Sequence, residues 1–322
     1  MSAKIAILIP PPRVTRYRYE RLRHCSRCGS FTSLREEVCS ACGRKGTLQP
    51  LERIGAFRAK GKVGLEALLL VLAAVAAVYL APNATERTVA AVLGAALLTG
   101  YGFLLRRYAA SQAPYRLHRV LLDRSEAIGE GLAADERAAE TDYEADHYLA
   151  CYEKLREIGV FLLDDRIRYN KLICLDRFML RKDMELELET VVPRKYNKLF
   201  VRYLWEVSKI DRSLIREKSI DYVLRYRGEI EKMNLGPELL TNIASAALKF
   251  RGNLGACEYL ISDYAASLPR ERFIRLCRLV AESGSDYPEL ALRVERIADS
   301  RYPHDSGVQA ALWIRGAVRP HA

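Results

Sequence analysis

The segment HCSRCGSFTSLREEVCSACGRKG, residues 24–46, contains two pairs of cysteines, and each pair is separated by two residues and followed by a glycine. Two intervening residues let both thiolates of a pair face one ion, and the glycine permits a tight turn after the pair. This spacing predicts a tetrahedral metal site, with one short hairpin between the pairs to bring the second back to the first. The expected ligands are Cys25, Cys28, Cys39 and Cys42.

The residues around this motif resemble the zinc-ribbon family, specifically its short membrane-associated bacterial members, over about residues 17–50. The resemblance implies a structural Zn²⁺ ion held by the four cysteines, no turnover at the metal, and a bacterial source. A closed shell of four thiolates has no open coordination position for water or substrate. His24 stands beside the first cysteine and is expected to flank the site rather than to replace a ligand.

The stretch RVTRYRYERLRH, residues 13–24, interleaves arginine with tyrosine and allows two interpretations. In the first, it is a strand that leads into the first cysteine pair, with its charges near anionic lipid. In the second, its arginines bind phosphates and its tyrosines stack on bases, so that it contacts nucleic acid. The candidate residues for nucleic-acid contact are Arg16, Tyr17, Arg18, Tyr19, Arg21 and Arg23.

Two apolar segments follow, Val63–Ala81 with one charge and Thr88–Leu105 with none. At 1.5 Å per residue each is about 27–28 Å long, close to the ~30 Å thickness of the hydrocarbon layer. They predict a transmembrane helical hairpin, residues 63–105, with a polar turn between the spans. Small residues at a spacing of four, Ala73/Ala77 and Ala96/Gly100, are expected to let these helices pack closely; the same hairpin allows a homo-oligomer.

Basic residues flank the hairpin on one side and predict its orientation. They are expected to contact anionic lipid headgroups, whereas the turn carries only Arg87, offset by Glu86. Both termini are therefore expected in the cytoplasm, at the cell membrane, where the reducing conditions suit free thiolates. The candidate lipid-contact residues are Arg53, Arg58, Lys60, Lys62, Arg106 and Arg107.

The net charge of +11 is concentrated at the N-terminus. Residues 1–62 carry fourteen Lys and Arg against four Asp and Glu, whereas the chain from Arg106 onward carries 36 against 34. This distribution argues against nucleic-acid binding by the large C-terminal part. The composition divides the chain into a zinc ribbon with its leading basic strand (1–50), a basic juxtamembrane linker (51–62), the hairpin (63–105), a stalk or linker helix (106–140) and a helical domain (141–322).

Apolar residues in the last of these segments recur at intervals of three and four, as on amphipathic helices. Pro237, Pro269 and Pro288 stand where helices are expected to begin, and six or seven helices of 12–20 residues are predicted from Pro193 onward. The predicted fold class is mainly α: a small β zinc ribbon, a two-helix transmembrane hairpin, and an all-α cytoplasmic domain that is solenoid-like or an irregular bundle.

Catalytic motifs are absent from the sequence, which contains no P-loop, G-x-S-x-G, H-E-x-x-H or G-x-G-x-x-G pattern. The chain is therefore expected not to be an enzyme, although an all-helical domain can hide a site. The expected function is a membrane-anchored cytoplasmic scaffold or adaptor that presents the zinc ribbon and the helical domain to a protein partner. The alternative is a membrane-tethered nucleic-acid-binding or regulatory protein that uses its basic N-terminal region.

Overall fold

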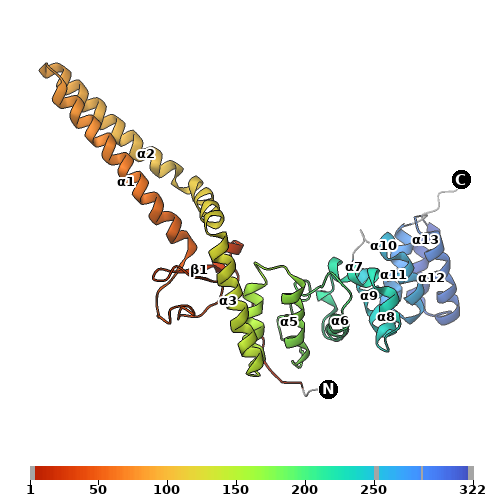
Figure 1. Cartoon of the computed structure of the whole chain (residues 1–322). Helices are drawn as coiled ribbons and strands as arrows, with labels where there is room; N and C mark the ends of the chain where they lie inside the picture. Colours follow the sequence, from red (N-terminus) through yellow and green to blue (C-terminus); the bar gives the residue numbers. More distant parts are fainter. Residues whose placement is uncertain (1–3, 250–253, 284–285, 318–322) are drawn as a thin grey trace. The chain divides into compact units, whose positions relative to one another are not determined.

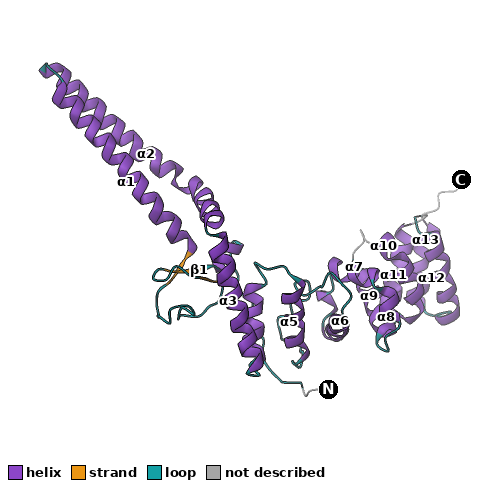
Figure 2. Cartoon of the chain, in the orientation of Figure 1, coloured by secondary structure: helices purple, strands orange, loops and turns teal. Residues whose placement is uncertain are grey.

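A computed structural model describes residues 4–249, 254–283 and 286–317. Within these ranges it describes the side chains except those of residues 52–63, 108–114, 116, 254 and 313–317. The chain is 66% helical with one small three-stranded sheet, which confirms a mainly α fold (Figures 1 and 2). It forms two compact units: a ribbon–hairpin unit of residues 14–145 and 156–161, and a helical unit of residues 1–13, 146–155 and 162–322.

The sheet of the ribbon–hairpin unit consists of β1 (Arg23–Cys25), β2 (Phe31–Thr32) and β3 (Leu48–Pro50). The central strand β1 runs antiparallel to both neighbours, so that His24 lies opposite Phe31 and opposite Gln49. The first cysteine pair forms the loop between β1 and β2. The second pair lies in a separate turn closed by a bridge between Val38 and Lys45. The single hairpin expected between the pairs is wrong, because the chain turns back directly after each pair.

The basic segment before β1 is not a continuous strand, contrary to the sequence-based expectation. Residues Arg18–Arg21 form a 3₁₀ helix, η1, and the strand β1 covers only Arg23–Cys25. The Glu20 carboxylate accepts a hydrogen bond from the backbone N–H of Arg16 at 2.8 Å and so closes the turn locally. Leu22, which follows η1, is 1% exposed and anchors this segment in the unit.

Two long helices, α1 (Leu51–Leu80) and α2 (Ala84–Asp123), lie side by side (Figure 1). Helix α1 starts directly after β3, so the expected juxtamembrane linker is helical and continuous with the apolar segment. The loop between the helices is shorter than the sequence suggested, because α2 already begins at Ala84. The side chain of Arg87 folds back and donates a hydrogen bond to the carbonyl of Ala81 at 3.1 Å.

The two helices pack through a face that differs from the expected one. A Cβ atom placed on Gly94 would lie 3.0 Å from the Cβ of Ala74, so the two backbones approach closely at this point. The expected small residues Ala73, Ala77, Ala96 and Gly100 are all exposed. The partly or fully buried positions instead follow the spacing of one helix face on each partner: Ala67, Leu70, Ala74 and Val78 on α1, and Ala90, Gly94, Leu98 and Leu105 on α2.

Among the residues whose side chains are described, one helical segment is long and apolar enough to cross a membrane, the 24 residues Ala84–Arg107 of α2. The described apolar part of α1, Gly64–Leu80, is shorter. Both segments expose large apolar side chains; Leu69 is 57% exposed and Leu97 is 67% exposed.

Helix α3 (Ser125–Glu144) follows α2 and packs against β2, and α4 (Tyr148–Ile158) follows after a turn at Asp146. The composition predicted a stalk or linker helix over residues 106–140. Helix α3 differs from a simple linker, because it buries one face, including two acidic residues. The buried residues are Ile128, Gly131, Leu132, Asp135, Glu136 and Ala139.

The helical unit contains short helices joined by short turns. Pro237 and Pro288 lie in the first turns of α9 and α12, and Pro269 directly precedes α11, as expected. The helices from Pro193 onward are shorter and more numerous than predicted, because the stretch 227–237 contains a helix of its own. Helix α5 (Asp165–Asp176) precedes Pro193, and the helices after it are, in order, α6 (Lys198–Ile210), η2 (Arg212–Leu214), α7 (Glu217–Arg225), α8 (Arg227–Glu231), α9 (Gly236–Ala247), α10 (Leu254–Tyr264), η4 (Ala265–Ser267), α11 (Arg270–Ser283), α12 (Pro288–Arg301) and α13 (Ser306–Ala317).

The N-terminal segment, residues 4–13, belongs to the helical unit and not to the ribbon that follows it. Ile5 forms a parallel bridge with Phe178: its N–H donates to the Arg177 carbonyl at 2.8 Å, and its carbonyl accepts from Met179 at 2.9 Å. Ile9 is 2% exposed. The stretch 14–145 is therefore inserted between two parts of the helical unit, a grouping that differs from the five consecutive segments expected from composition.

This packing predicts that Ile9→Ala destabilises the helical unit by about 2–3 kcal/mol, because truncation of a buried isoleucine leaves a cavity. Ile5→Ala is the matched control, since Ile5 is 44% exposed and contributes mainly its backbone. The measurement is the urea concentration at which the buried thiols of Cys151 and Cys174 react in the full-length protein in detergent. Equal midpoints for the two variants would show that the side chain of Ile9 does not stabilise the unit.

Candidate metal centre

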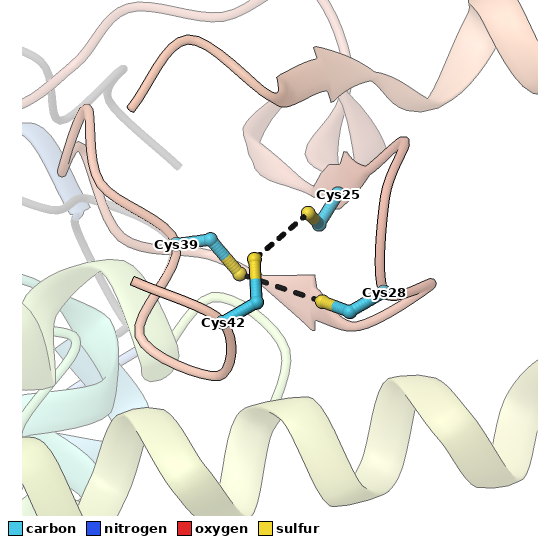
Figure 3. A group of neighbouring side chains, drawn as sticks. All are labelled: Cys25, Cys28, Cys39 and Cys42. Atoms are coloured by element: carbon cyan, nitrogen blue, oxygen red, sulfur yellow. Dashed lines mark hydrogen bonds between the residues drawn. The ribbon is translucent and has the colours of Figure 1, made fainter. Parts of the chain in front are cut away.

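The four predicted ligands meet in space, with their sulfur atoms turned toward a common centre (Figure 3). All four Sγ atoms lie within 4.8 Å of one another. The Sγ atoms of Cys25 and Cys42, and those of Cys28 and Cys39, are each 3.7 Å apart. A tetrahedral Zn²⁺ site with Zn–S distances of about 2.3 Å places its sulfurs about 3.8 Å apart. The donor set and its spacing therefore fit a tetrahedral thiolate-bound metal ion.

Each cysteine pair is shaped by the glycine that follows it. The N–H of Gly29 donates to the Cys25 carbonyl at 3.0 Å, and the N–H of Gly43 donates to the Cys39 carbonyl at 2.8 Å. Both glycines have positive φ angles, 79° and 68°, in the left-handed region that residues with a Cβ rarely adopt. These turns explain why the sequence repeats a glycine after each pair.

Two hydroxyl groups lie against the sulfurs. Ser30 Oγ is 3.1 Å from Cys28 Sγ and 3.3 Å from Cys39 Sγ. Thr47 Oγ1 is 3.2 Å from Cys25 Sγ. Hydroxyls at this distance can donate to metal-bound thiolates, fixing their orientation and spreading their negative charge.

The pKa values of two of the thiols are shifted in opposite directions, and a bound cation would favour the ionised form of both. Burial raises the pKa of Cys25, but hydrogen bonds from the backbone of Cys28 and the hydroxyl of Thr47 outweigh it and bring the pKa to about 6. The Arg44 backbone lowers the pKa of Cys42, but desolvation and the neighbouring thiols raise it to about 11. The Cys25 thiol therefore ionises readily, whereas the neighbouring thiols oppose ionisation of Cys42. A divalent cation at the centre allows all four to ionise together.

The candidate metal ligands are all cysteines. Within the described part of the chain, they are the only group of three or more His, Cys, Asp or Glu residues placed closely enough to hold an ion. His24 is half-buried and its ring packs on Phe31 at 5.0 Å between centroids, outside the cluster as expected. Burial, aided by the charge of Arg124, lowers the pKa of His24.

The ribbon is fixed to α3 by a buried carboxylate that the sequence did not reveal. Asp135, 1% exposed, accepts hydrogen bonds from Thr32 Oγ1 at 2.7 Å, the Ser33 backbone N–H at 2.7 Å and Ser33 Oγ at 2.9 Å. Burial raises the pKa of Asp135, and these three hydrogen bonds act in the opposite direction. Its position was detectable in principle, because Asp135 lies three residues from Leu132 and four from Ala139 on the same helix face.

A second buried acid, Glu157, binds the ribbon from the short segment 156–161 of the same unit. Its side chain is 5% exposed and forms ion pairs with Arg21 at 3.0 Å and Arg35 at 3.2 Å. Arg21 is almost as buried as its partner, at 11% exposed, whereas Arg35 is 53% exposed. Ion pairs from both sides of the first cysteine pair therefore converge on one carboxylate.

The candidate nucleic-acid residues fall into two groups. Arg16, Tyr17, Arg18 and Tyr19 are exposed around η1. Arg21 is paired with buried Glu157, and Arg23 donates to the Glu36 carbonyl at 3.2 Å. Among the candidate lipid-contact residues, Arg106 and Arg107 are exposed on α2. The side chains of Arg53, Arg58, Lys60 and Lys62 lie outside the described residues.

The chain was compared with protein-family models, with curated proteins and with solved structures, and none of them matches it. The zinc-ribbon resemblance of residues 17–50 therefore depends on the spacing and geometry of the four cysteines alone.

The cluster predicts that the purified full-length protein binds about one Zn²⁺ per chain, and that Cys39→Ser reduces this to near zero. Cys277→Ser is the matched control, because Cys277 is a buried thiol of α11 far along the chain from the cluster. Metal analysis of the three proteins after gel filtration measures the stoichiometry. Unchanged zinc in Cys39→Ser would exclude the site.

Proposed function

We propose that the chain is a membrane-anchored scaffold whose zinc ribbon and helical unit, both cytoplasmic, bind a protein partner at the inner face of the membrane. The observation that carries the proposal is the uncovered apolar surface of α1 and α2. Large aliphatic side chains project outward along both helices; Leu72 is 55% exposed and Phe103 is 68% exposed. Burial of such a surface in lipid is strongly favourable, whereas exposure of it to water is not.

The arrangement of the helices supports two spans rather than one. An apolar helix of this length is also found in protein cores, but the side chains of Ala84–Arg107 are almost all uncovered. The segment Gly64–Leu80 packs against Ala84–Arg107 through Ala74 and Gly94. If α2 spans the bilayer, this part of α1 therefore lies in the bilayer too. Its 17 residues reach about 26 Å, and a short span is accommodated by slight thinning of the bilayer.

The charges at the helix ends support cytoplasmic termini. Arg106 and Arg107 follow the apolar part of α2, and four basic residues of the sequence precede that of α1, whereas the connecting loop has a balanced pair of charges. Helix α1 also extends from Leu51 to the first apolar residues, a distance of about 20 Å at 1.5 Å per residue. The interfacial layer is only about 5–8 Å deep on each side. In this proposal the first turns of α1 contact the lipid headgroups. The ribbon, which precedes α1, lies on the cytoplasmic side of the headgroup layer and does not contact the lipid.

The scaffold role follows from the chemistry of the two units. Four thiolates close the metal site and provide no position for a substrate. The helical unit supplies a surface of short helices, and the chain from Arg106 onward is nearly neutral, with 36 Lys and Arg against 34 Asp and Glu, which suits protein binding better than nucleic-acid binding. The exposed residues Arg16, Tyr17, Arg18 and Tyr19 remain the basis of the alternative, a tethered nucleic-acid-binding protein.

The proposed topology is tested by labelling intact cells with a membrane-impermeant thiol reagent. A cysteine placed at exposed Asn83, in the loop, is expected to react from outside. One placed at exposed Ser306, at the start of α13, is expected to react only after permeabilisation. Reaction of Ser306→Cys in intact cells would reverse the topology and place the thiol cluster in an oxidising space.

The two functions are separated by purification of the intact protein in mild detergent, followed by analysis of bound protein and nucleic acid. The scaffold proposal expects a stoichiometric protein partner that is retained by an Arg16→Glu, Arg18→Glu double variant. Nucleic acid that co-purifies with the wild type and is lost in the double variant would establish the alternative function instead.

A further inference from the structure

The segment between the two cysteine pairs has both ends at the metal site. Cys28 lies at its start and Cys39 at its end, and their sulfurs are 3.7 Å apart. An ion bound there joins the ends of the segment and fixes its path. The segment carries the donors Thr32, Ser33 and Arg35 in its middle.

These donors bind two buried acidic residues, one on α3 and one on α4. Thr32 and Ser33, 7% and 0% exposed, supply three hydrogen bonds to Asp135 of α3. Arg35 pairs with Glu157, which lies at the end of α4. One short segment of the ribbon therefore supplies three hydrogen bonds to Asp135 of α3 and one of the two ion pairs of Glu157.

Loss of the segment's shape would leave Asp135 without its three donors, and would leave Glu157 with Arg21 as its ion-pair partner. A buried carboxylate that loses its donors must take up a proton or return to water, and either change is unfavourable in the docked state. The contact is also close in space, since a Cβ on Gly131 would lie 2.2 Å from the Phe31 carbonyl oxygen. Helix α3 can dock only if the backbone at Phe31 keeps this position.

The ribbon has little else to hold that shape. Its strands are two and three residues long. Its buried apolar side chains are few, and a module of this size usually depends on its metal for folding. The positions of Thr32, Ser33 and Arg35 are therefore tied to the occupancy of the cysteine site.

We propose that the ribbon is a metal-dependent clamp on α3: with the cysteine site loaded, residues 31–35 hold Asp135, and with the site empty they release the helix. The inference rests on the proposed metal site. Reciprocity of coupled equilibria then requires that loss of the Asp135 contacts weakens metal binding.

The test uses the full-length protein in detergent, loaded with Zn²⁺ or treated with a chelator, and measures amide hydrogen exchange. Chelation is expected to speed exchange at least about tenfold in residues 126–144, besides the ribbon itself. Residues 270–283 of α11, in the helical unit, are the internal reference and are expected to keep their exchange rates.

Asp135→Asn tests the same coupling without removal of metal. It replaces an acceptor with an amide that cannot satisfy all three donors, and it is expected to weaken zinc affinity about tenfold in competition with a chromogenic chelator. Glu140→Gln is the matched control, because Glu140 is an exposed acid of the same helix, and its affinity is expected to equal that of the wild type.

The outcomes separate the clamp from the metal site. If chelation opens residues 23–48 but leaves exchange in residues 126–144 unchanged, the clamp is wrong and the metal site stands. If Asp135→Asn binds zinc as tightly as Glu140→Gln, the coupling is likewise excluded. If the purified protein binds no zinc, both the clamp and the metal site of the proposed function are wrong.

Discussion

Gly131→Ala is expected to undock the ribbon from α3, at a cost of about 3 kcal/mol or more in the free energy of local opening. A Cβ atom at this position would lie 2.2 Å from the Phe31 carbonyl oxygen and 2.8 Å from its carbonyl carbon. Both contacts are with backbone, so no side chain can rotate to relieve them. The Ser33 N–H, which donates to Asp135, reports the opening directly. Its hydrogen exchange is expected to accelerate by roughly 100-fold, since 1.4 kcal/mol corresponds to a factor of ten.

Gly129→Ala is the control for this substitution. Gly129 lies on the same helix, two residues away, and a Cβ there meets nothing within 4 Å. Alanine favours the helix over glycine by about 0.5–1 kcal/mol, so exchange at Ser33 is expected to stay the same or to slow slightly. Similar exchange rates in the two variants would mean that α3 does not depend on the close approach to Phe31.

The clustering of the four cysteines was predictable from the sequence because its signal is local. Two residues between thiolates and a glycine after each pair restrict the backbone within four residues, and the structure shows those turns at Gly29 and Gly43. The apolar periodicity of the C-terminal part and the helix starts at Pro237 and Pro288 are local signals of the same kind. They require no knowledge of what the helices pack against.

Contacts between distant segments were not predictable in this way. Asp135 stands in a run of acids that a solvated helix would also carry, and its burial depends on Thr32 and Ser33, about a hundred residues earlier. The attachment of residues 4–13 to Phe178 is similarly non-local. The contact face of the hairpin was also assigned wrongly, since several rows of small residues satisfy the same spacing and only the partner helix selects Ala74 and Gly94.

The two arginines that bind Glu157 are expected to differ sharply in their contributions to stability. Arg21→Met removes a partner that is itself 11% exposed, and it leaves a buried carboxylate with one exposed counter-ion. Breaking a buried ion pair from one side costs about 3 kcal/mol or more. Arg35→Met removes a partner that is 53% exposed, and such pairs contribute less than about 1 kcal/mol.

Hydrogen exchange across residues 17–25 of the full-length protein measures this difference. Arg21→Met is expected to speed exchange there by about 100-fold, and Arg35→Met by less than about fivefold. Equal effects would mean that Glu157 is solvated and that the pair with Arg21 contributes no more than a surface pair. That result would also return Arg21 to the candidates for nucleic-acid contact. A large effect of Arg21 alone identifies it as a structural residue and leaves Arg16 and Arg18 as the exposed arginines around η1 on which the alternative function depends.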